Sequence, residues 1–128
     1  MYARDAAART LGIAIEEVRP GYARLSMVVS TSMLNGHDVV HGGFIFALAD
    51  TAFAYACNSR NESNVALNAA ISFTAPGRAE ERLVATAQER SRAGRTGIYD
   101  VEVQNERGEK IAFFRGTSYR IGGTVIPS

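Results

Sequence analysis

The stretch from His41 to Cys57 constrains the fold most strongly. It opens with Gly42-Gly43 and continues as Phe-Ile-Phe-Ala-Leu-Ala-Asp-Thr-Ala-Phe-Ala-Tyr-Ala-Cys. Alanine and leucine favour helix, and apolar residues occur on every side of this helix instead of along one stripe. We therefore predict a long helix over residues 42–57 that is wrapped by other elements and ends in the polar stretch 58–64.

Alternating apolar residues predict strands on both sides of this helix. Residues 13–19 and 22–30 read as two strands joined by a turn at Pro20-Gly21, after a short helix over residues 4–11. Four further strands follow the long helix, over residues 65–73, 83–89, 99–103 and 111–121, separated by turn signals at 76–77, 93–94 and 105–108. In the first of these four, Val65, Leu67, Ala69, Ile71 and Phe73 are expected to share one face. The order predicts an α+β fold in which an antiparallel sheet of five to six strands wraps one helix.

Length and composition limit what such a fold can do. At 128 residues, the chain is expected to form a single domain over residues 1–128, with one core but no deep private cavity. A formal charge of +1 argues against a nucleic-acid-binding protein. No apolar run approaches the roughly 18 residues that would cross a membrane. The single Cys57 and the absence of a secretory signal pattern indicate a buried thiol and a cytoplasmic location.

Asp50 does not fit its surroundings. It lies in the middle of the predicted helix, and no Lys or Arg occurs between His41 and Ser59 to compensate it. A buried carboxylate is costly unless it is paired, hydrogen-bonded or protonated, and burial raises its pKa. Asp50 is either a catalytic carboxylate or a group with a partner on the sheet or at a wetted subunit edge.

The start of the same helix is the second unusual feature. Gly42 and Gly43 leave backbone N–H groups exposed where the helix dipole is positive. Such an end can stabilise negative charge on a carbonyl oxygen, although a tight turn into the helix would also favour glycine. Eight residues separate Gly42 from Asp50, about 12 Å along one helix. If both act on one carbonyl, Asp50 must come from a second copy of the chain.

These residues resemble those of a known family. The runs Leu34-Asn-Gly-His-Asp-Val-Val-His-Gly-Gly43 and Ala47-Leu-Ala-Asp-Thr-Ala-Phe-Ala-Tyr-Ala-Cys-Asn-Ser59 are similar to those of hotdog-fold acyl-CoA thioesterases, in particular the phenylacetic acid degradation (PaaI) branch. The later runs Thr96-Gly-Ile-Tyr-Asp100 and Phe114-Arg-Gly-Thr-Ser-Tyr-Arg-Ile-Gly-Gly123 agree. The resemblance implies the hotdog fold, assembled as a homodimer and usually as a dimer of dimers (a homotetramer).

The resemblance also implies roles for residues. Asp50 matches the catalytic carboxylate that activates water or attacks the thioester, and Gly42 matches the glycine whose N–H polarises the thioester carbonyl. Asn35 and His41 match polar residues that line the same site from the partner chain, and Gly43 is expected to contact substrate. Some relatives hold the attacking water with a hydroxyl early in the strand after the helix; this chain has only Asn68 there as a substitute.

Coenzyme A brings phosphates, and 13 of the 14 basic residues are arginines, which suit phosphate contacts. We expect Arg90, Arg92 and Arg95 to hold the phosphates, with Thr96 and Gly97 adding backbone donors; an ordinary solvated turn is the competing interpretation. No cofactor is expected, because coenzyme A is part of the substrate. His37 and His41 with Asp38 form only a weak metal pattern, and the resemblance implies no metal.

The substrate is expected to be hydroxyphenylacetyl-CoA or a related aryl-acyl-CoA, on resemblance alone. Phe44, Phe46, Phe53 and Tyr55 could line an aryl pocket, although most of them are expected to be core. Two alternatives stay open. One is a hotdog-fold dehydratase of hydroxyacyl thioesters, with His41 and Asp50 as its acid–base pair; the other is a non-catalytic acyl-CoA-binding domain.

Overall fold

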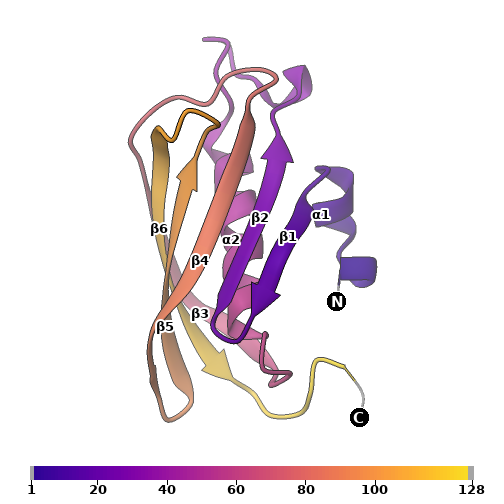
Figure 1. The fold of residues 1–128 in the computed structure, drawn as a ribbon, viewed down its shortest axis with the longest axis vertical. Helices are drawn as coiled ribbons and strands as arrows, with labels where there is room; N and C mark the ends of the chain where they lie inside the picture. The colour runs from indigo at the N-terminus through magenta and orange to yellow at the C-terminus, as the bar shows by residue number, and fades with distance from the viewer. Residues whose placement is uncertain (1, 127–128) are drawn as a thin grey trace.

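The computed structural model describes residues 2–126 as one antiparallel sheet with a long helix against it (Figure 1). The six strands lie in the order β1-β2-β4-β5-β6-β3. Their bounds are β1 Ala14–Arg19, β2 Tyr22–Val28, β3 Asn64–Phe73, β4 Arg82–Ala93, β5 Thr96–Gln104 and β6 Lys110–Arg120. This is the hotdog architecture that the sequence predicted, with the strands in the predicted chain order.

The helix α2, Gly42–Cys57, begins and ends where the apolar run does. One side of it packs against the sheet, where β2, β4 and β5 make most of the contacts. Phe53 forms the centre of this core and lies edge-on to Tyr99, with 5.7 Å between ring centroids. It also requires Gly116 on β6, because a Cβ there would lie 2.8 Å from its ring. The helix residues buried in this packing are Ile45, Leu48, Ala49, Ala52, Phe53, Tyr55, Ala56 and Cys57.

The sheet wraps one side of α2, as predicted, but among residues 2–126 no element covers the opposite side. Residues at helical spacing on this side are half-buried or exposed. They are Gly43, Ala47, Asp50, Thr51, Ala54 and Asn58. We call them the open stripe; it consists mainly of small side chains, which permit close approach of another helix.

The strand β3 departs from the alternation expected of it. The register against β6 shifts between Ala66 and Asn68, so Leu67 lies in a bulge. Ala69 and Val65 therefore lie on opposite faces, because their partners Gly116 and Tyr119 do. Val65 and Leu67 are 46% and 63% exposed. The prediction of one shared face fails because a bulge changes the parity of the strand.

The N-terminal helix is also different from the prediction. A 3-10 turn, η1 Tyr2–Arg4, precedes a five-residue helix, α1 Ala6–Thr10, and the Asp5 carboxylate caps α1 by accepting from the Ala8 N–H at 3.0 Å. Asp5 breaks the run because a capping side chain competes with helix continuation. A second 3-10 turn, η2 Thr31–Met33, begins the loop before α2. None of the helices in residues 2–126 has the length and apolar content to span a membrane.

Candidate active site

The first turn of α2 presents free backbone donors. The structure records no acceptor among residues 2–126 for the N–H groups of Gly42 and Gly43, and the His41 side chain makes no capping bond. The first amides of a helix have no partner within the helix. They therefore point positive dipole ends toward open space, where a carbonyl oxygen could accept from them.

Phe73, at the end of β3, lies against this helix start. A Cβ on Gly42 would come within 2.7 Å of the tip of the Phe73 ring, so any larger residue here would have to displace that ring; φ at this position is ordinary. Phe73 is 51% exposed and forms one wall of a groove of about 450 Å³. No charged side chain lines it; the lining is Val39, Val40, Gly42, Ile45, Phe73, Thr74, Ala75, Pro76 and Gly77.

Asn35 organises the loop that leads to Gly42. Its Oδ1 accepts from the backbone N–H of His37 at 2.8 Å and of Val39 at 3.4 Å, which turns the chain back toward α2. Its side-chain amide nitrogen has no recorded acceptor within residues 2–126, and it remains a candidate donor to a ligand. The His41 side chain is exposed directly before the free amides. Both residues belong to the segment that leads into the helix, and their role in the site stays a prediction.

Asp50 lies on the open stripe, half-buried, with no hydrogen bond or ion pair recorded to any residue from 2 to 126. Desolvation raises the pKa of its carboxyl above the usual range, as predicted. The sequence left open that Asp50 is held by a hydrogen-bond partner on the sheet instead of acting in catalysis. Among residues 2–126 of one chain, no such partner is recorded. The carboxylate is open to whatever covers the stripe.

Asp50 and Gly42 belong to the same regular helix, so their separation of about 12 Å along the axis holds in the structure. The donors and the carboxylate of one chain therefore cannot meet at one carbonyl carbon.

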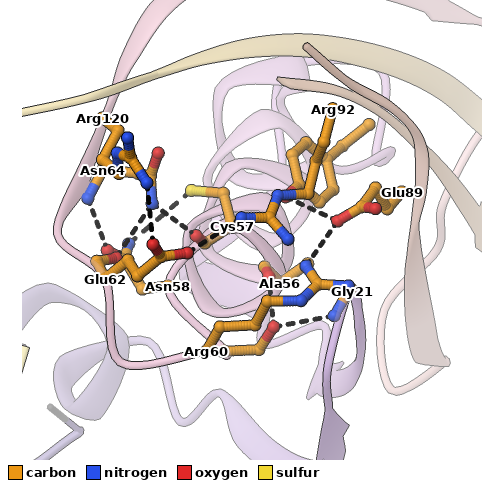
Figure 2. A network of polar contacts seen from close by, with 12 residues as sticks. Gly21, Ala56, Cys57, Asn58, Arg60, Glu62, Asn64, Glu89, Arg92 and Arg120 are labelled. Carbon is orange, nitrogen blue, oxygen red and sulfur yellow. Dashed lines mark hydrogen bonds and ion pairs between the residues drawn. The ribbon is translucent and has the colours of Figure 1, made fainter. Parts of the chain in front are cut away.

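A pocket rich in arginine lies beyond the other end of α2, where the β4–β5 hairpin meets the start of β3 (Figure 2). Cys57, the last residue of α2, lines it; its thiol is buried and its pKa is raised to about 12, mainly by desolvation and also by the charge of Asp50 two turns earlier. The other lining residues are Arg60, Glu62, Asn64, Arg92, Gly94, Arg95, Thr96, Gly97, Tyr99, Ser118 and Arg120. We call this the arginine pocket.

The structure groups only some of the predicted coenzyme A contacts. Arg92, Arg95, Thr96 and Gly97 line the arginine pocket together. Arg90 does not, because the register between β4 and β5 shifts at this residue, and its guanidinium pairs with Asp100 at 3.1 Å on the outer face of the sheet. Asn68 also lies on that outer face, in register with Thr117, and not beside α2.

Four residues of interest were not predicted. Phe73 was assigned only to one face of a strand. Arg60, Glu62 and Arg120 are brought to the pocket by the loop after α2 and the end of β6. Their grouping depends on strand register, which gives no local sequence signal. The predicted aromatic residues of α2 are mostly core: Phe53 and Tyr55 are buried, and Phe46 packs edge-on to Phe114. Across residues 2–126, no three His, Cys, Asp or Glu side chains gather as metal ligands.

Known proteins are similar to this chain in fold and sequence. The thioesterase superfamily model matches residues 37–112. The chain is 50% identical over 125 residues to the acyl-coenzyme A thioesterase PaaI of Escherichia coli (strain K12), with 98% of this chain and 89% of that protein covered. The structure of the E. coli PaaI protein from the phenylacetic acid degradation operon superposes with a TM-score of 0.95 at 51% identity, covering 97% of this chain and 90% of that one. A substituted form of the phenylacetic acid degradation protein PaaI from Thermus thermophilus gives 0.88 at 38% identity, covering 91% and 100%.

The sheet order, the long helix against the sheet and the free amides at its start define a hotdog-fold enzyme. The chain belongs to the thioesterase superfamily, on a match that covers more than half of its length and on relatives that cover nearly all of it.

Proposed function

We propose that this thioesterase hydrolyses acyl-CoA thioesters to a free acid and coenzyme A, at sites shared between two copies of the chain. One observation carries the proposal: α2 presents free N–H groups at its start and an unpaired, half-buried Asp50 about 12 Å further along. These are the two parts that thioester hydrolysis needs, and they belong to a chain of this superfamily. The name of its E. coli relative, an acyl-coenzyme A thioesterase, supports acyl-CoA as the substrate.

A two-fold dimer would bring the two parts together. If two α2 helices pack antiparallel through the open stripe, Asp50 of each chain approaches Gly42 of the other. The stripe has the small residues that such packing requires. The free edge of β3 supports the same arrangement, because an exposed, apolar, ten-residue edge strand is normally paired or protected. We also expect two such dimers to assemble into a tetramer, because the chain resembles hotdog-fold thioesterases that do so.

The chemistry then follows from the two groups. The thioester carbonyl oxygen accepts from the partner's Gly42 N–H, which stabilises the oxyanion, with the Asn35 amide beside it. Asp50 takes a proton from a water molecule that attacks the carbonyl carbon, the C–S bond breaks, and the coenzyme A thiolate leaves and is protonated. Alternatively, Asp50 attacks directly and water opens the resulting anhydride. Neither route requires a metal or a cofactor.

The acyl group is proposed to be an aryl-acetyl group, such as that of hydroxyphenylacetyl-CoA. The groove beside Gly42 supports this assignment, because it is apolar and one wall is the exposed ring of Phe73. An aryl ring in this groove would lie against Phe73 while its carbonyl reaches the Gly42 amide. Phe73 thus takes the place that the sequence interpretation gave to the aromatic residues of α2.

The arginine pocket is the proposed site for the coenzyme A phosphates. It lies just beyond Cys57, about 10 Å along the helix from Asp50 of the same chain, a separation that the long pantetheine arm of coenzyme A can span. Arg92 and Arg95 would contact the phosphates, with backbone donors from Thr96 and Gly97.

The test is steady-state hydrolysis of a panel of acyl-CoA thioesters: hydroxyphenylacetyl, phenylacetyl, benzoyl and straight-chain. We expect release of free thiol, with the highest kcat/KM for aryl-acetyl groups. An Asp50→Asn variant, purified and folded identically, should have lost most of this activity. No thiol release from any member of the panel would refute the proposed reaction. Incorporation of oxygen-18 into Asp50 in a single turnover would identify the anhydride route.

A further inference from the structure

The arginine pocket already contains an anionic group of the chain itself. Glu62, in the loop between α2 and β3, extends one carboxylate oxygen to Arg92 and the other to Arg120, each at 2.9 Å (Figure 2). The two arginines come from strands at opposite sides of the pocket, β4 and β6. The Glu62 carboxylate therefore bridges the pocket as a bound anion would.

The space that remains is small. With Glu62 in place, about 20 Å³ is free, which suits roughly one water molecule and not a phosphate group. The charge balance nevertheless favours an anion, because four arginines line the pocket and only two carboxylates pair with them, that of Glu62 and that of Glu89. The four are Arg60, Arg92, Arg95 and Arg120.

The charged side chains of the arginine pocket differ in how firmly other groups hold them. Arg95 is bound to the end of β6, donating to the Arg120 carbonyl oxygen at 2.9 Å, and Arg60 is paired with Glu89 at 2.6 Å. The Glu62 side chain is 35% exposed, and its partners Arg92 and Arg120 are 42% and 39% exposed. Exposed pairs of this kind are weak and exchange readily. Glu62 is thus the component of the pocket that can most easily be displaced.

The loop backbone does not depend on the Glu62 carboxylate. Asn58 Oδ1 accepts from the Asn64 N–H at 2.8 Å, and the Asn64 side chain donates to the carbonyl oxygens of Cys57 at 2.8 Å and Glu62 at 2.9 Å. Two asparagines therefore fix the path of residues 58–64. Neutralising Glu62 should leave the fold intact.

We propose that Glu62 is a placeholder for a substrate phosphate: it holds Arg92 and Arg120 in position in the free enzyme and is displaced when a phosphate of coenzyme A enters. This inference rests on the proposed function and deepens it, because it adds Arg120 to the phosphate contacts and makes Glu62 a positioning residue that competes with the substrate. It predicts an uncommon result, that removing a charged residue from the site tightens substrate binding.

The experiment compares one acyl group on two carriers, coenzyme A and pantetheine, which lacks the phosphates. For Glu62→Gln at low ionic strength, we expect the KM for the CoA thioester to fall about fivefold, because two arginines lose a competing charge. The kcat and the KM for the pantetheine thioester should not change. Arg120→Gln should raise the KM for the CoA thioester about tenfold and leave the pantetheine thioester unaffected.

The matched control is Glu102→Gln, which removes an exposed carboxylate paired with Lys110 at 3.3 Å on the outer face; it should change neither KM. Binding of free coenzyme A, measured by calorimetry, should become tighter in Glu62→Gln and weaker in Arg120→Gln. An unchanged or raised KM for the CoA thioester in Glu62→Gln would overturn the placeholder role. Equal KM values for the two carriers in the unsubstituted enzyme would mean that the phosphates contribute nothing to binding and would overturn the placeholder role, whereas an enzyme inactive on both carriers would refute the proposed reaction itself.

Discussion

The two ends of α2 present opposite kinds of surface. At the Gly42 end, neutral amide donors open onto an apolar groove without a charged side chain in its lining. At the Cys57 end, four arginines surround a carboxylate. The first suits a carbonyl and an apolar acyl group, and the second suits phosphates. Fifteen residues, about 22 Å along the helix, separate them, with Asp50 between. In the proposed dimer, one helix would therefore contribute parts of two different half-sites, each completed by the two-fold partner.

The largest effect should come from Asp50→Asn. Loss of the base or nucleophile is expected to lower kcat by about 10³-fold, with little change in KM, since the side chain acts on the reacting atoms. Steady-state kinetics with a hydroxyphenylacetyl thioester would measure it. A variant that retains more than a tenth of the activity would mean that another group performs the chemistry.

The Gly42 end can be tested by removing one N–H. Proline is tolerated at the first position of a helix, so Gly42→Pro deletes the donor without breaking α2. We expect kcat to fall about 10²-fold to 10³-fold. Gly42→Ala is the control, because it introduces the same Cβ approach to Phe73 and keeps the N–H. If both variants lose activity equally, crowding against Phe73 is responsible and the donor is not.

The groove predicts a change of specificity. Phe73→Leu keeps an apolar contact with Gly42 and removes the aromatic ring, so kcat/KM for aryl-acetyl thioesters should fall about tenfold relative to straight-chain thioesters. The ratio of the two substrates in one enzyme preparation is the measurement. Phe113→Leu, an exposed aromatic on the outer face, should leave that ratio unchanged. If this ratio is unchanged in Phe73→Leu, the acyl group does not bind in this groove.

Substitutions of Arg95 and Arg90 should differ in their effect on KM, by a smaller factor than those above. Arg95→Gln should raise the KM for a CoA thioester about threefold to fivefold, whereas Arg90→Gln should not, because Arg90 is already paired with Asp100 on the outer face. Both variants should be tested against the same acyl-pantetheine. A larger effect from Arg90 than from Arg95 would contradict the separation of these residues by the β4 bulge.

The smallest effect concerns pH. The raised pKa of Asp50 means that the folded protein keeps this proton to a higher pH than the unfolded chain does. The free energy of unfolding should therefore decrease as pH rises from the ordinary Asp pKa through the raised one, while kcat increases over the same range as the carboxylate ionises. At pH values above this range, Asp50→Asn should have a higher Tm than the unsubstituted protein, and at pH values below it the two should have the same Tm. Thermal unfolding at a series of pH values would show this.

The sequence predicted the elements well and their mutual placement less well. The bounds of α2 follow from its own composition, and the buried faces of β2 and β5 follow from alternation. Local pattern also identified Asp50 and Gly42, because a lone carboxylate and a Gly-Gly helix start are visible without the fold. The bulges at Leu67 and Arg90 have no such signal, since they arise from pairing with β6 and β5. Phe73, Glu62 and Arg120 were missed for the same reason: long-range register brings them to the site.

Mixed dimers test directly whether Asp50 of one chain and Gly42 of another form one site. Asp50→Asn and Gly42→Pro chains, each nearly inactive alone, are unfolded together in equal amounts and refolded. Half of the dimers formed at random are mixed, and each of those has one site with both groups intact, so activity should recover to about a quarter of the unsubstituted enzyme. Activity that stays at the level of the separate variants, with mixed dimers demonstrated by mass spectrometry, would contradict the shared site.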